Sequence, residues 1–338
     1  MLKTAIVILN YNGRDFLERF LPLVKKHSTG HQIIVADNLS TDDSVSFLQS
    51  THPDIQLIQL TNNFGYAGGY NAALEKIEAT YYVLLNSDIE VTPGWIEPII
   101  DLMDQFEDIA ACQPKILSFY EKKRFEYAGA AGGFIDSLGY PFCRGRIFDS
   151  IENDHGQYND TRQVFWASGA CLFIRSKVFH ELGGFDKDFF AHMEEIDLCW
   201  RMQRSGYKIF YNSESTVYHV GGGTLPKSNS RKTYLNFRNN LSMLYKNSGF
   251  RAILWKLPLR FTMDLLAGLK FLFNGSPTDF LAILKAQFHF FLLLGSNTRK
   301  RQKTLRNPQK TKYEEIYSRS IVYSYYLKKI KFFKDLPF

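Results

Sequence analysis

The chain has few cysteines, no cysteine pairs and no long uninterrupted apolar run. Its four cysteines, in 338 residues, are widely separated and none belongs to a CxxC pair: Cys112, Cys143, Cys171 and Cys199. This spacing argues against a zinc site or a disulfide framework and favours a reducing compartment. Residues 1–4 lead directly into an apolar run, which leaves no room for a secretory signal. We therefore expect a cytoplasmic location.

Two nucleotide-binding fingerprints are also missing. The first apolar run, residues 4–9, is followed by Asn10-Tyr11-Asn12-Gly13 and not by the G-x-G-x-x-G of dinucleotide-binding proteins. The Gly-rich stretch 62–71 lacks the Gly-Lys-Ser/Thr of a P-loop. Binding of NAD or FAD is disfavoured. A Gly-rich loop that enters a helix still offers backbone N–H groups to an anion, although a plain strand-to-helix turn is the commoner explanation.

Charge is distributed unevenly along the chain. Residues 1–224 carry 19 Lys and Arg against 29 Asp and Glu, a net of −10, whereas residues 225–338 carry 22 against 5, a net of +17. The two parts are therefore different in character. The acidic part is typical of a soluble enzyme, and the basic, aromatic-rich part favours an anionic surface as its partner.

The first part alternates between apolar runs of strand length and segments with helical periodicity. Strands are expected at 4–9, 32–36, 55–60, 81–85, 110–117 and 165–175, with a short one at 216–220, and helices at 71–77, at 95–106 and from Glu194 onward. This alternation predicts an α/β fold with a mainly parallel, doubly wound sheet. Residues 118–163 are expected to form hairpins and a mobile loop that serves as an active-site lid.

Asn and Asp residues gather where the predicted strands end. They are Asn10, Asn12, Asp37, Asn38, Asn86 and Asp88. Ligands bind beyond the carboxyl ends of strands in open α/β sheets, so Asp88 is well placed to hold a metal that in turn holds phosphate. Asp37 is suited to accept from the N–H of a base. Ordinary turn and cap residues are an equally open explanation for each position taken alone.

An acidic helix start and a histidine loop add candidate chemistry downstream. Glu194, Glu195 and Asp197 lie within four residues, and their mutual repulsion raises the proton affinity of at least one, as a general base requires. An acidic first turn favoured by the helix dipole explains them equally well. His219 precedes three glycines, 221–223, which suit a loop over a pyrophosphate, and it is either a further metal ligand or a structural histidine.

Taken together, these stretches resemble glycosyltransferase family 2 and, within it, the bacterial rhamnosyltransferase-like branch. The similarity covers residues 3–224, in which six motifs occur in the expected order. The resemblance implies a GT-A fold, a nucleoside-diphosphate sugar donor, Mg²⁺ or Mn²⁺, inversion at the anomeric carbon, and a glycan or lipid-linked glycan acceptor in cell-surface polysaccharide synthesis.

The resemblance also assigns roles to residues. Asp37 would read the base, with further donor contacts from Asn10, Asn12, Asn38, Asn63, Gly65, Tyr66, Asn71 and Asn86. Asp88 and His219 would bind the metal. Glu195 stands where the family usually has an aspartate as base, and the extra methylene leaves Glu194 or Asp197 as possible partners in that role. Trp166, Gly169 and Asp186 would shape the sugar or acceptor pocket, although core packing is the stronger explanation for Trp166.

The basic part, residues 225–338, is expected to be helical and to lie on the surface of the inner membrane. The apolar segments 261–273 and 280–294 are too short, and too often interrupted by polar residues, for membrane spans. Interleaved Lys, Arg and aromatic residues suit helices in a membrane surface. No nucleic-acid-binding module accompanies these residues, so nucleic acid is not expected. Packing against the catalytic part with a solvated basic face is the alternative.

Two other functions remain open at this stage. A basic membrane- or polyanion-binding protein with a degenerate sugar-nucleotide domain would not need the acidic positions or His219. A sugar-1-phosphate nucleotidyltransferase usually carries a Gly-rich, basic triphosphate loop after its first strand, and residues 10–13 do not resemble one. Neither the sugar, the base nor the acceptor follows from the sequence.

Overall fold

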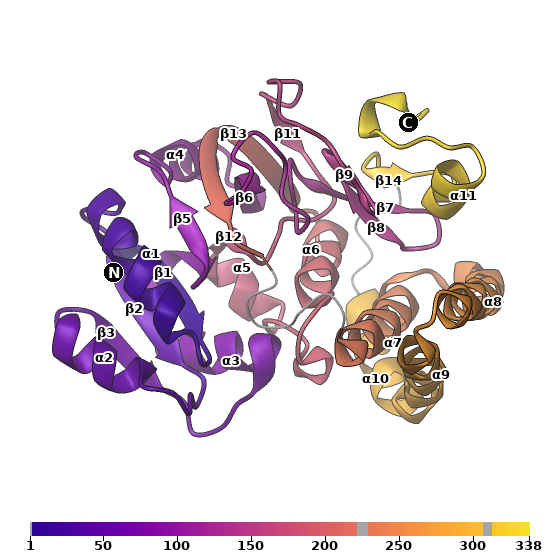
Figure 1. The fold of residues 1–338 in the computed structure, drawn as a ribbon, viewed down its shortest axis with the longest axis horizontal. Coiled ribbons are helices and arrows are strands. Elements are labelled where there is room, and N and C mark those ends of the chain that lie inside the picture. The colour runs from indigo at the N-terminus through magenta and orange to yellow at the C-terminus, as the bar shows by residue number, and fades with distance from the viewer. Residues whose placement is uncertain (1, 222–228, 307–312) are drawn as a thin grey trace.

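The computed structural model describes residues 2–221, 229–306 and 313–338. Its main sheet has nine strands in these ranges, in the order β11-β13-β6-β12-β4-β1-β2-β3, and β5 pairs with β13 (Figure 1). The strands are β1 (Leu2–Asn10), β2 (Gln32–Asp37), β3 (Gln56–Gln59), β4 (Ala79–Asn86), β5 (Ile89–Val91), β6 (Ile109–Ser118), β11 (Thr161–Gln163), β12 (Cys171–Arg175) and β13 (Lys208–His219).

The strands β1, β2, β3 and β4 run parallel to one another, and β13 is parallel to β6. Strand β12 is antiparallel to both β4 and β6. The predicted α/β fold with a mainly parallel sheet is confirmed. Helices cover both faces: α1 (Arg14–His27), α2 (Ser44–Thr51), α3 (Gly65–Leu74), α4 (Glu97–Gln105), α5 (Ser176–Glu181) and α6 (Glu194–Arg204).

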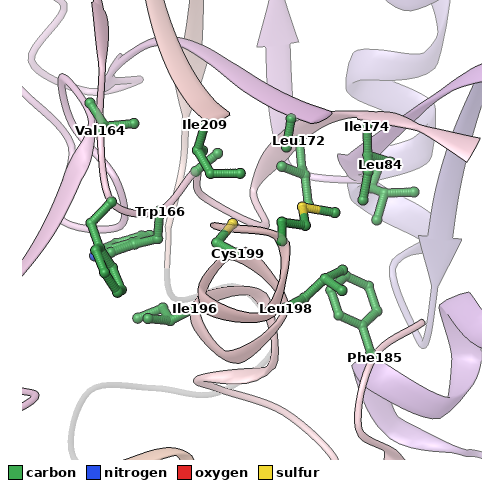
Figure 2. Close-up of a cluster of buried hydrophobic side chains, with 14 of the residues drawn as sticks. Leu84, Val164, Trp166, Leu172, Ile174, Phe185, Ile196, Leu198, Cys199 and Ile209 are labelled. Carbon is green, nitrogen blue, oxygen red and sulfur yellow. The ribbon is translucent and has the colours of Figure 1, made fainter. Parts of the chain in front are cut away.

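Two hydrophobic clusters fill the spaces between sheet and helices. One contains Leu17, Leu21 and Val24 of α1 with Ile99 and Met103 of α4. The other contains residues of α3 and α6 on the opposite face, and Figure 2 shows Cys199 of α6 directed toward the strands, Ile196 on the side of Trp166 and Leu198 beside Phe185. All four cysteines are buried and free. The start of α6 is therefore fixed by its own apolar face against the sheet.

Three predicted boundaries differ from the structure. The helix expected at 71–77 begins at Gly65, because the Gly-rich stretch itself forms its first turns. The strand expected at 165–175 begins only at Cys171, since Trp166 instead makes a single bridge to Gly133. The strand expected at 216–220 is longer and starts at Lys208. Gly222 and Gly223 lie outside the described residues.

The segment 118–163 forms hairpins, as expected, but they pack as a second sheet. Its strands are β7 (Gly133–Asp136), β8 (Pro141–Cys143), β9 (Arg146–Ile147) and β10 (Ser150–Ile151), and β14 (Ile316–Tyr317) joins β7 from near the C-terminus. Phe134, Phe142 and Ile147 are each at most 1% exposed. The prediction of a mobile lid is therefore wrong for these hairpins, because their side chains are part of the hydrophobic core.

The basic part is helical, as predicted. It contains α7 (Ser230–Asn247), α8 (Phe250–Phe273), α9 (Pro277–Leu292), α10 (Leu294–Leu305) and α11 (Ile321–Tyr326). Figure 1 shows α7 beside α6, with α8 and α9 on the far side of α7 from the main sheet. Within the described ranges, no single helix has the length and apolarity to cross a membrane; only α9 and α10 together, bent by 64°, meet that criterion.

Candidate active site

Three polar residues meet at the carboxyl edge of the parallel strands. The register pairs Asn10 with Asp37, and Leu9 with Asn86, so the ends of β1, β2 and β4 lie side by side. Asn10 Nδ2 donates to Asp37 Oδ1 at 3.1 Å, and the backbone N–H of Ser40 donates to Asp37 Oδ2 at 2.9 Å. Asp37 is 3% exposed. Its carboxylate is held in one orientation, with lone pairs left to accept from a ligand.

The side chain of Asn38 shapes the loop that precedes α3. Its Nδ2 donates to Asn63 Oδ1 at 3.1 Å and to the Gly65 carbonyl at 3.0 Å, and its Oδ1 accepts from the Phe64 N–H at 3.0 Å. Gly65 has φ +69°, and an added Cβ would lie 2.5 Å from the Phe190 carbonyl oxygen. Only glycine fits this close approach. Asn38, Asn63 and Gly65 thus act on the shape of the loop.

Two predicted donor residues make contacts within the protein. Asn71 Nδ2 donates to the Phe185 carbonyl at 2.8 Å, and its Oδ1 accepts from the Phe185 N–H at 2.9 Å. Asn12 Oδ1 accepts from the Thr41 N–H at 2.7 Å. Asn71 therefore holds the backbone of Phe185 in place, and Asn12 holds the loop that follows β2 against the loop that follows β1. These contacts occupy both polar atoms of the Asn71 amide.

Asp88 and His219 are brought together by the pairing of β5 with β13, in which Ile89 lies opposite His219. His219 Nε2 lies 3.1 Å from Asp88 Oδ1, and His219 Nδ1 lies 3.2 Å from Glu126 Oε2. Burial acts to lower the pKa of His219, but the two carboxylates outweigh it and raise the pKa to about 10. The same ring holds the pKa of Asp88 and of Glu126 below their usual values against the effect of burial.

Asp88 and His219 would fit a divalent cation, shared with a ligand, once the ion displaces the proton that His219 Nε2 shares with Asp88, because a ligating imidazole must be neutral. Two atoms that each lie ~2.1 Å from one ion at right angles are about 3.0 Å apart, close to the spacing of Asp88 Oδ1 and His219 Nε2. Within the described part of the chain, no group of three or more His, Cys, Asp or Glu side chains is arranged as a metal site. Magnesium-type ions commonly take one or two protein ligands and complete their shell with phosphate and water.

The first turn of α6 carries two carboxylates that each have one oxygen without a hydrogen-bond partner in the described part of the chain. Glu194 Oε2 and Glu195 Oε2 are buried, and neither has a hydrogen-bond partner among the described residues. Burial raises the pKa of Glu195 to about 7, and burial together with the charge of Glu195 raises the pKa of Glu194 well above its usual value. These shifts favour the neutral form of Glu194, whereas a pKa of about 7 leaves Glu195 poised to lose or accept a proton near neutral pH, as a general base must be.

Contacts of Tyr66 connect this turn with the strand ends. Tyr66 Oη donates to the Gly169 carbonyl at 2.5 Å, and the neighbouring Ala170 carbonyl accepts from the Asn86 N–H at 3.0 Å. The pKa of Tyr66 is raised well above its usual value by burial and by the negative charges of Tyr70, Glu194 and Glu195. The phenol is therefore close to the acidic turn as well as to the end of β4.

Other candidate pocket residues belong to the interior. Trp166 is 4% exposed, and its Nε1 donates to the Phe134 carbonyl at 2.9 Å, in agreement with core packing (Figure 2). Asp197 is fully buried; its Oδ2 accepts from Arg201 Nε at 2.9 Å and its Oδ1 lies 3.0 Å from Lys246 Nζ. Although burial acts to raise the pKa of Asp197, these cations hold it below its usual value. Asp197 is therefore a structural anion and is unsuited to share the role of base.

Asp186 belongs to the same ion-pair network. Its two oxygens lie 2.5 Å from Lys246 Nζ and 2.5 Å from Lys300 Nζ, and these cations lower its pKa despite burial. Lys300 also pairs with Asp188 at 2.6 Å. The predicted pocket residue thus ties α7 and α10 to the segment before α6, and its carboxylate is already satisfied by lysines.

Sequence reasoning missed two residues of the site. Glu126 lies in the hairpin segment whose pattern revealed little, and only the fold brings it to His219. Asn239 of α7 donates through Nδ2 to the carbonyls of Phe189, Ala191 and His192 at 2.9, 2.9 and 2.8 Å. Its amide lies within a basic helix, and its sequence neighbours carry no signal of this role.

Asn239 supports a strained segment. Phe190, His192 and Met193 have φ values of +64°, +70° and +72°, in the left-handed region that non-glycine residues seldom adopt. Such backbone strain costs on the order of 1–3 kcal/mol per residue and persists only where surrounding contacts hold it. The strained segment leads directly into Glu194 and Glu195.

The family model for glycosyl transferase family 2 matches residues 5–183, which include the strand ends, the Gly-rich loop and Asp88. The chain belongs to glycosyl transferase family 2. It is therefore an enzyme, a glycosyltransferase. The predicted family is confirmed. The match to the family model ends before α6, so the roles of Glu194 and Glu195 are argued from the geometry of the structure.

Known proteins resemble this family member at low identity. It is 25% identical over 275 residues, 76% of this chain and 88% of the relative, to N-acetylglucosaminyl-diphospho-decaprenol L-rhamnosyltransferase of Mycobacterium tuberculosis. Its fold is similar to mannosyltransferase PcManGT from Pyrobaculum calidifontis, in complex with GDP-Man and Mn²⁺, with a TM-score of 0.53, 15% identity, and coverage of 89% of this chain and 83% of that one.

GalNAc-T7, solved with UDP, GalNAc and Mn²⁺, gives a TM-score of 0.56 at 15% identity over 72% of this chain. This chain spans 48% of that protein. Both structural neighbours are GT-A glycosyltransferases, so the family 2 enzyme has the expected GT-A fold.

Proposed function

We propose that this glycosyltransferase moves a sugar, with inversion, from a nucleoside-diphosphate sugar to a hydroxyl of a lipid-linked glycan during cell-surface polysaccharide synthesis. In this proposal residues 1–224 form the catalytic domain, and residues 225–338 form a basic helical region that works at the cytoplasmic face of the membrane. The observation that carries it is the combination of a partly buried Glu195, whose Oε2 has no hydrogen-bond partner among the described residues, with a strand edge lined by Asn10, Asp37 and Asn86.

The donor lies along the strand edge in this account. Asp37 accepts from the base, and Asn10 and Asn86 line the path of the ribose and diphosphate. Glu195 faces the acceptor hydroxyl and takes its proton as the oxygen attacks the anomeric carbon. The bond from that carbon to the phosphate oxygen breaks on the opposite face, and its electron pair leaves with the nucleoside diphosphate. One displacement with opposed attacking and leaving groups inverts the centre.

The protonation states of the acidic turn support this assignment. The raised pKa of Glu194 disfavours a second negative charge beside the base, and Glu195 has a pKa of about 7. A base with a pKa near the working pH contributes roughly 10²–10⁴-fold in rate. Glu195 is therefore preferred to Glu194 as the base. In this proposal its side chain, one methylene longer than an aspartate, reaches the acceptor hydroxyl directly, with no metal ligand between the carboxylate and the hydroxyl.

Asp88 and His219 would hold the metal, Mg²⁺ or Mn²⁺. When bound, the ion supplies Lewis-acid stabilisation of the charge that develops on the departing diphosphate. Glu126 lies behind His219 and fixes the orientation of its ring through Nδ1. A carboxylate behind a ligating imidazole is a common outer contact of metal sites.

A lipid-linked acceptor is supported by the helical region. The M. tuberculosis relative is named for a decaprenol-linked diphospho-sugar acceptor. On α8 and α9, large apolar residues are at least 51% exposed: Phe250, Leu254, Trp255, Leu266, Phe273, Leu281, Phe288, Phe291 and Leu292. Exposed cations including Arg251, Lys270 and Lys285 are interspersed with them. Such a surface suits the boundary of an anionic membrane.

The test is thermal melting of the full chain with a panel of nucleoside diphosphates, with and without Mn²⁺, followed by transfer assays with the matching nucleotide sugars. A ligand that binds the folded state must raise the melting temperature. Metal-dependent stabilisation by one nucleotide, and sugar transfer from it, are expected. Stabilisation by none of them would contradict the proposal and favour a binding protein with a degenerate site.

A further inference from the structure

A groove of about 530 Å³ lies between α7 and α9, apart from the proposed donor and base residues and beside the exposed apolar surface of α9. Its lining consists of Ser230, Arg231, Tyr234, Thr278, Leu281, Ala282 and Lys285. Thr278, Leu281 and Lys285 lie on one face of α9 because they are three and four residues apart. The groove therefore presents one cation from each helix and an apolar wall between them.

The two cations lack acidic partners. Among the residues that the structure describes, no carboxylate lies within 4.0 Å of Arg231 or Lys285, whereas the nearby Asp279 accepts from Thr233 Oγ1 at 2.6 Å. The Arg231 guanidinium instead lies 4.9 Å from the centre of the Phe190 ring, and Lys285 Nζ lies 5.4 Å from that of Tyr234. Both positive charges remain available to an anion.

The groove adjoins the catalytic loop through Phe190. The Phe190 carbonyl accepts from the Ala67 N–H at 3.1 Å, at the start of α3, and Phe190 precedes Glu194 by four residues. Arg231 packs on the same ring. A molecule in the groove would therefore lie beside the segment that joins the donor loop to the proposed base.

On its other side the groove continues into the exposed apolar surface. Leu281 is 60% exposed, and Leu284 and Phe288 follow at helical spacing along α9 with 38% and 62% exposed. Figure 1 shows α9 on the outer side of α7 from α6. Arg231 therefore lies against the catalytic loop, and Lys285 lies beside an apolar stripe on the exposed face of α9.

We infer that this groove binds the diphosphate and the first isoprene units of a polyprenyl-diphosphate acceptor, with the diphosphate on Arg231 and Lys285 and the chain along Leu281, Leu284 and Phe288. This rests on the proposed function for the identity of the acceptor. The order of groups, cation then apolar stripe, matches the order of diphosphate and lipid in such a molecule. The sugar would then extend past Phe190 toward Glu195.

The experiment measures calorimetric binding of farnesyl diphosphate, farnesol and inorganic diphosphate to the full-length protein in EDTA, so that no metal-dependent binding at the donor site contributes. Arg231→Gln/Lys285→Gln is compared with Arg299→Gln/Lys303→Gln, which removes the same charge from exposed positions on α10. Since a charge-assisted hydrogen bond contributes about 1.5–3 kcal/mol, the groove variant is expected to bind farnesyl diphosphate about tenfold or more weakly, and the control within about twofold.

Further arms separate the possible occupants. Leu281→Ser should weaken binding of farnesyl diphosphate but leave inorganic diphosphate unchanged, and Arg231→Lys/Lys285→Arg should restore part of the affinity. Equal losses in both double variants, or no loss in either, would overturn the inference. So would a groove variant that loses only its flotation with phosphatidylglycerol vesicles, because a bulk lipid headgroup would then be the occupant. Melting with nucleotide and Mn²⁺ reports on the donor site separately, so its failure would count against the proposed function alone.

Discussion

Asn239 Nδ2 lies 2.8 Å from the carbonyl oxygen of His192, so a helix of the basic region holds the backbone that leads into the acidic turn. The same amide reaches the carbonyls of Phe189 and Ala191. A residue of the basic region therefore contributes to the position of Glu195 without touching substrate.

Replacing this amide should impair turnover more than donor binding. In Asn239→Ala, we expect kcat to fall about ten- to a hundredfold, because small displacements of a reacting group have effects of this size. The variant also removes three hydrogen bonds, one buried and two partly buried, and unpaired polar groups of this kind cost about 1–3 kcal/mol of stability. Steady-state kinetics and urea unfolding measure the two effects. Asn239→Asp keeps the size but cannot donate, so it should behave alike; a normal kcat in both variants would contradict a positioning role.

The pH profile should report the titration of Glu195. Its pKa of about 7 means that kcat/KM falls below neutral pH with the loss of one ionised group. At pH 8 to 9, where the wild-type carboxylate is ionised, Glu195→Gln should lower kcat by roughly 10²–10⁴-fold, and the difference should shrink toward pH 5. Rates measured from pH 5 to pH 9 give the profile. An unchanged rate in Glu195→Gln at pH 8 to 9 would contradict its role. Glu194→Gln, which keeps a neutral side chain at that position, should lose much less activity than Glu195→Gln.

Stability should change with pH in the direction set by the same group. The folded-state pKa of Glu195 exceeds its ordinary value of 4.5, so the folded protein binds the proton more tightly than the unfolded chain. This stabilisation is fully present below pH 4.5 and is lost as pH rises through about 7. Urea unfolding of wild type and Glu195→Gln should therefore show a difference that grows from pH 5 to pH 8, with the wild type weaker at pH 8. A difference independent of pH would contradict this.

Lys246 should be a strong determinant of stability. It is 2% exposed and pairs with both Asp186 and Asp197. Lys246→Met leaves two buried carboxylates short of a cation, and removing one partner of a buried pair costs about 3–5 kcal/mol. Lys300→Met, whose side chain is 30% exposed, is the matched control and should cost less. Chemical denaturation of the two variants checks the order; equal losses would contradict the network.

Much of the main sheet could be predicted because its signals are local. Apolar runs of strand length predicted β1, β2 and β4 in the correct order. The polar turn residues that follow these runs predicted that Asn10, Asp37 and Asp88 lie at or just beyond the strand ends. The position of Gly65 was harder, because the first turn of α3 is stabilised by the distant Asn38. Local pattern predicted a loop there.

The remaining parts of the site depend on contacts between distant segments. Glu126 reaches His219 because its N–H donates to the Ile116 carbonyl of β6 at 3.1 Å, and β6 pairs with β13, which ends at His219. Asp186 and Asp197 are acidic residues near a helix start, and nothing adjacent to them in sequence indicates that lysines of α7 and α10 neutralise them. In sequence, Asp186 and Asp197 are acidic residues near the start of α6, as Glu194 and Glu195 are. Only the pairing with lysines distinguishes these two structural carboxylates from the proposed reactive carboxylate of Glu195.

The central claim is that Asp88 serves the donor and Glu195 the acceptor of one transferred sugar. The most direct measurement follows Mn²⁺-dependent nucleotide binding and sugar transfer side by side in Asp88→Asn and Glu195→Gln. We predict that Asp88→Asn loses both, whereas Glu195→Gln binds nucleotide as the wild type does and loses transfer. Wild-type transfer by Glu195→Gln, or unchanged metal-dependent binding by Asp88→Asn, would contradict the account.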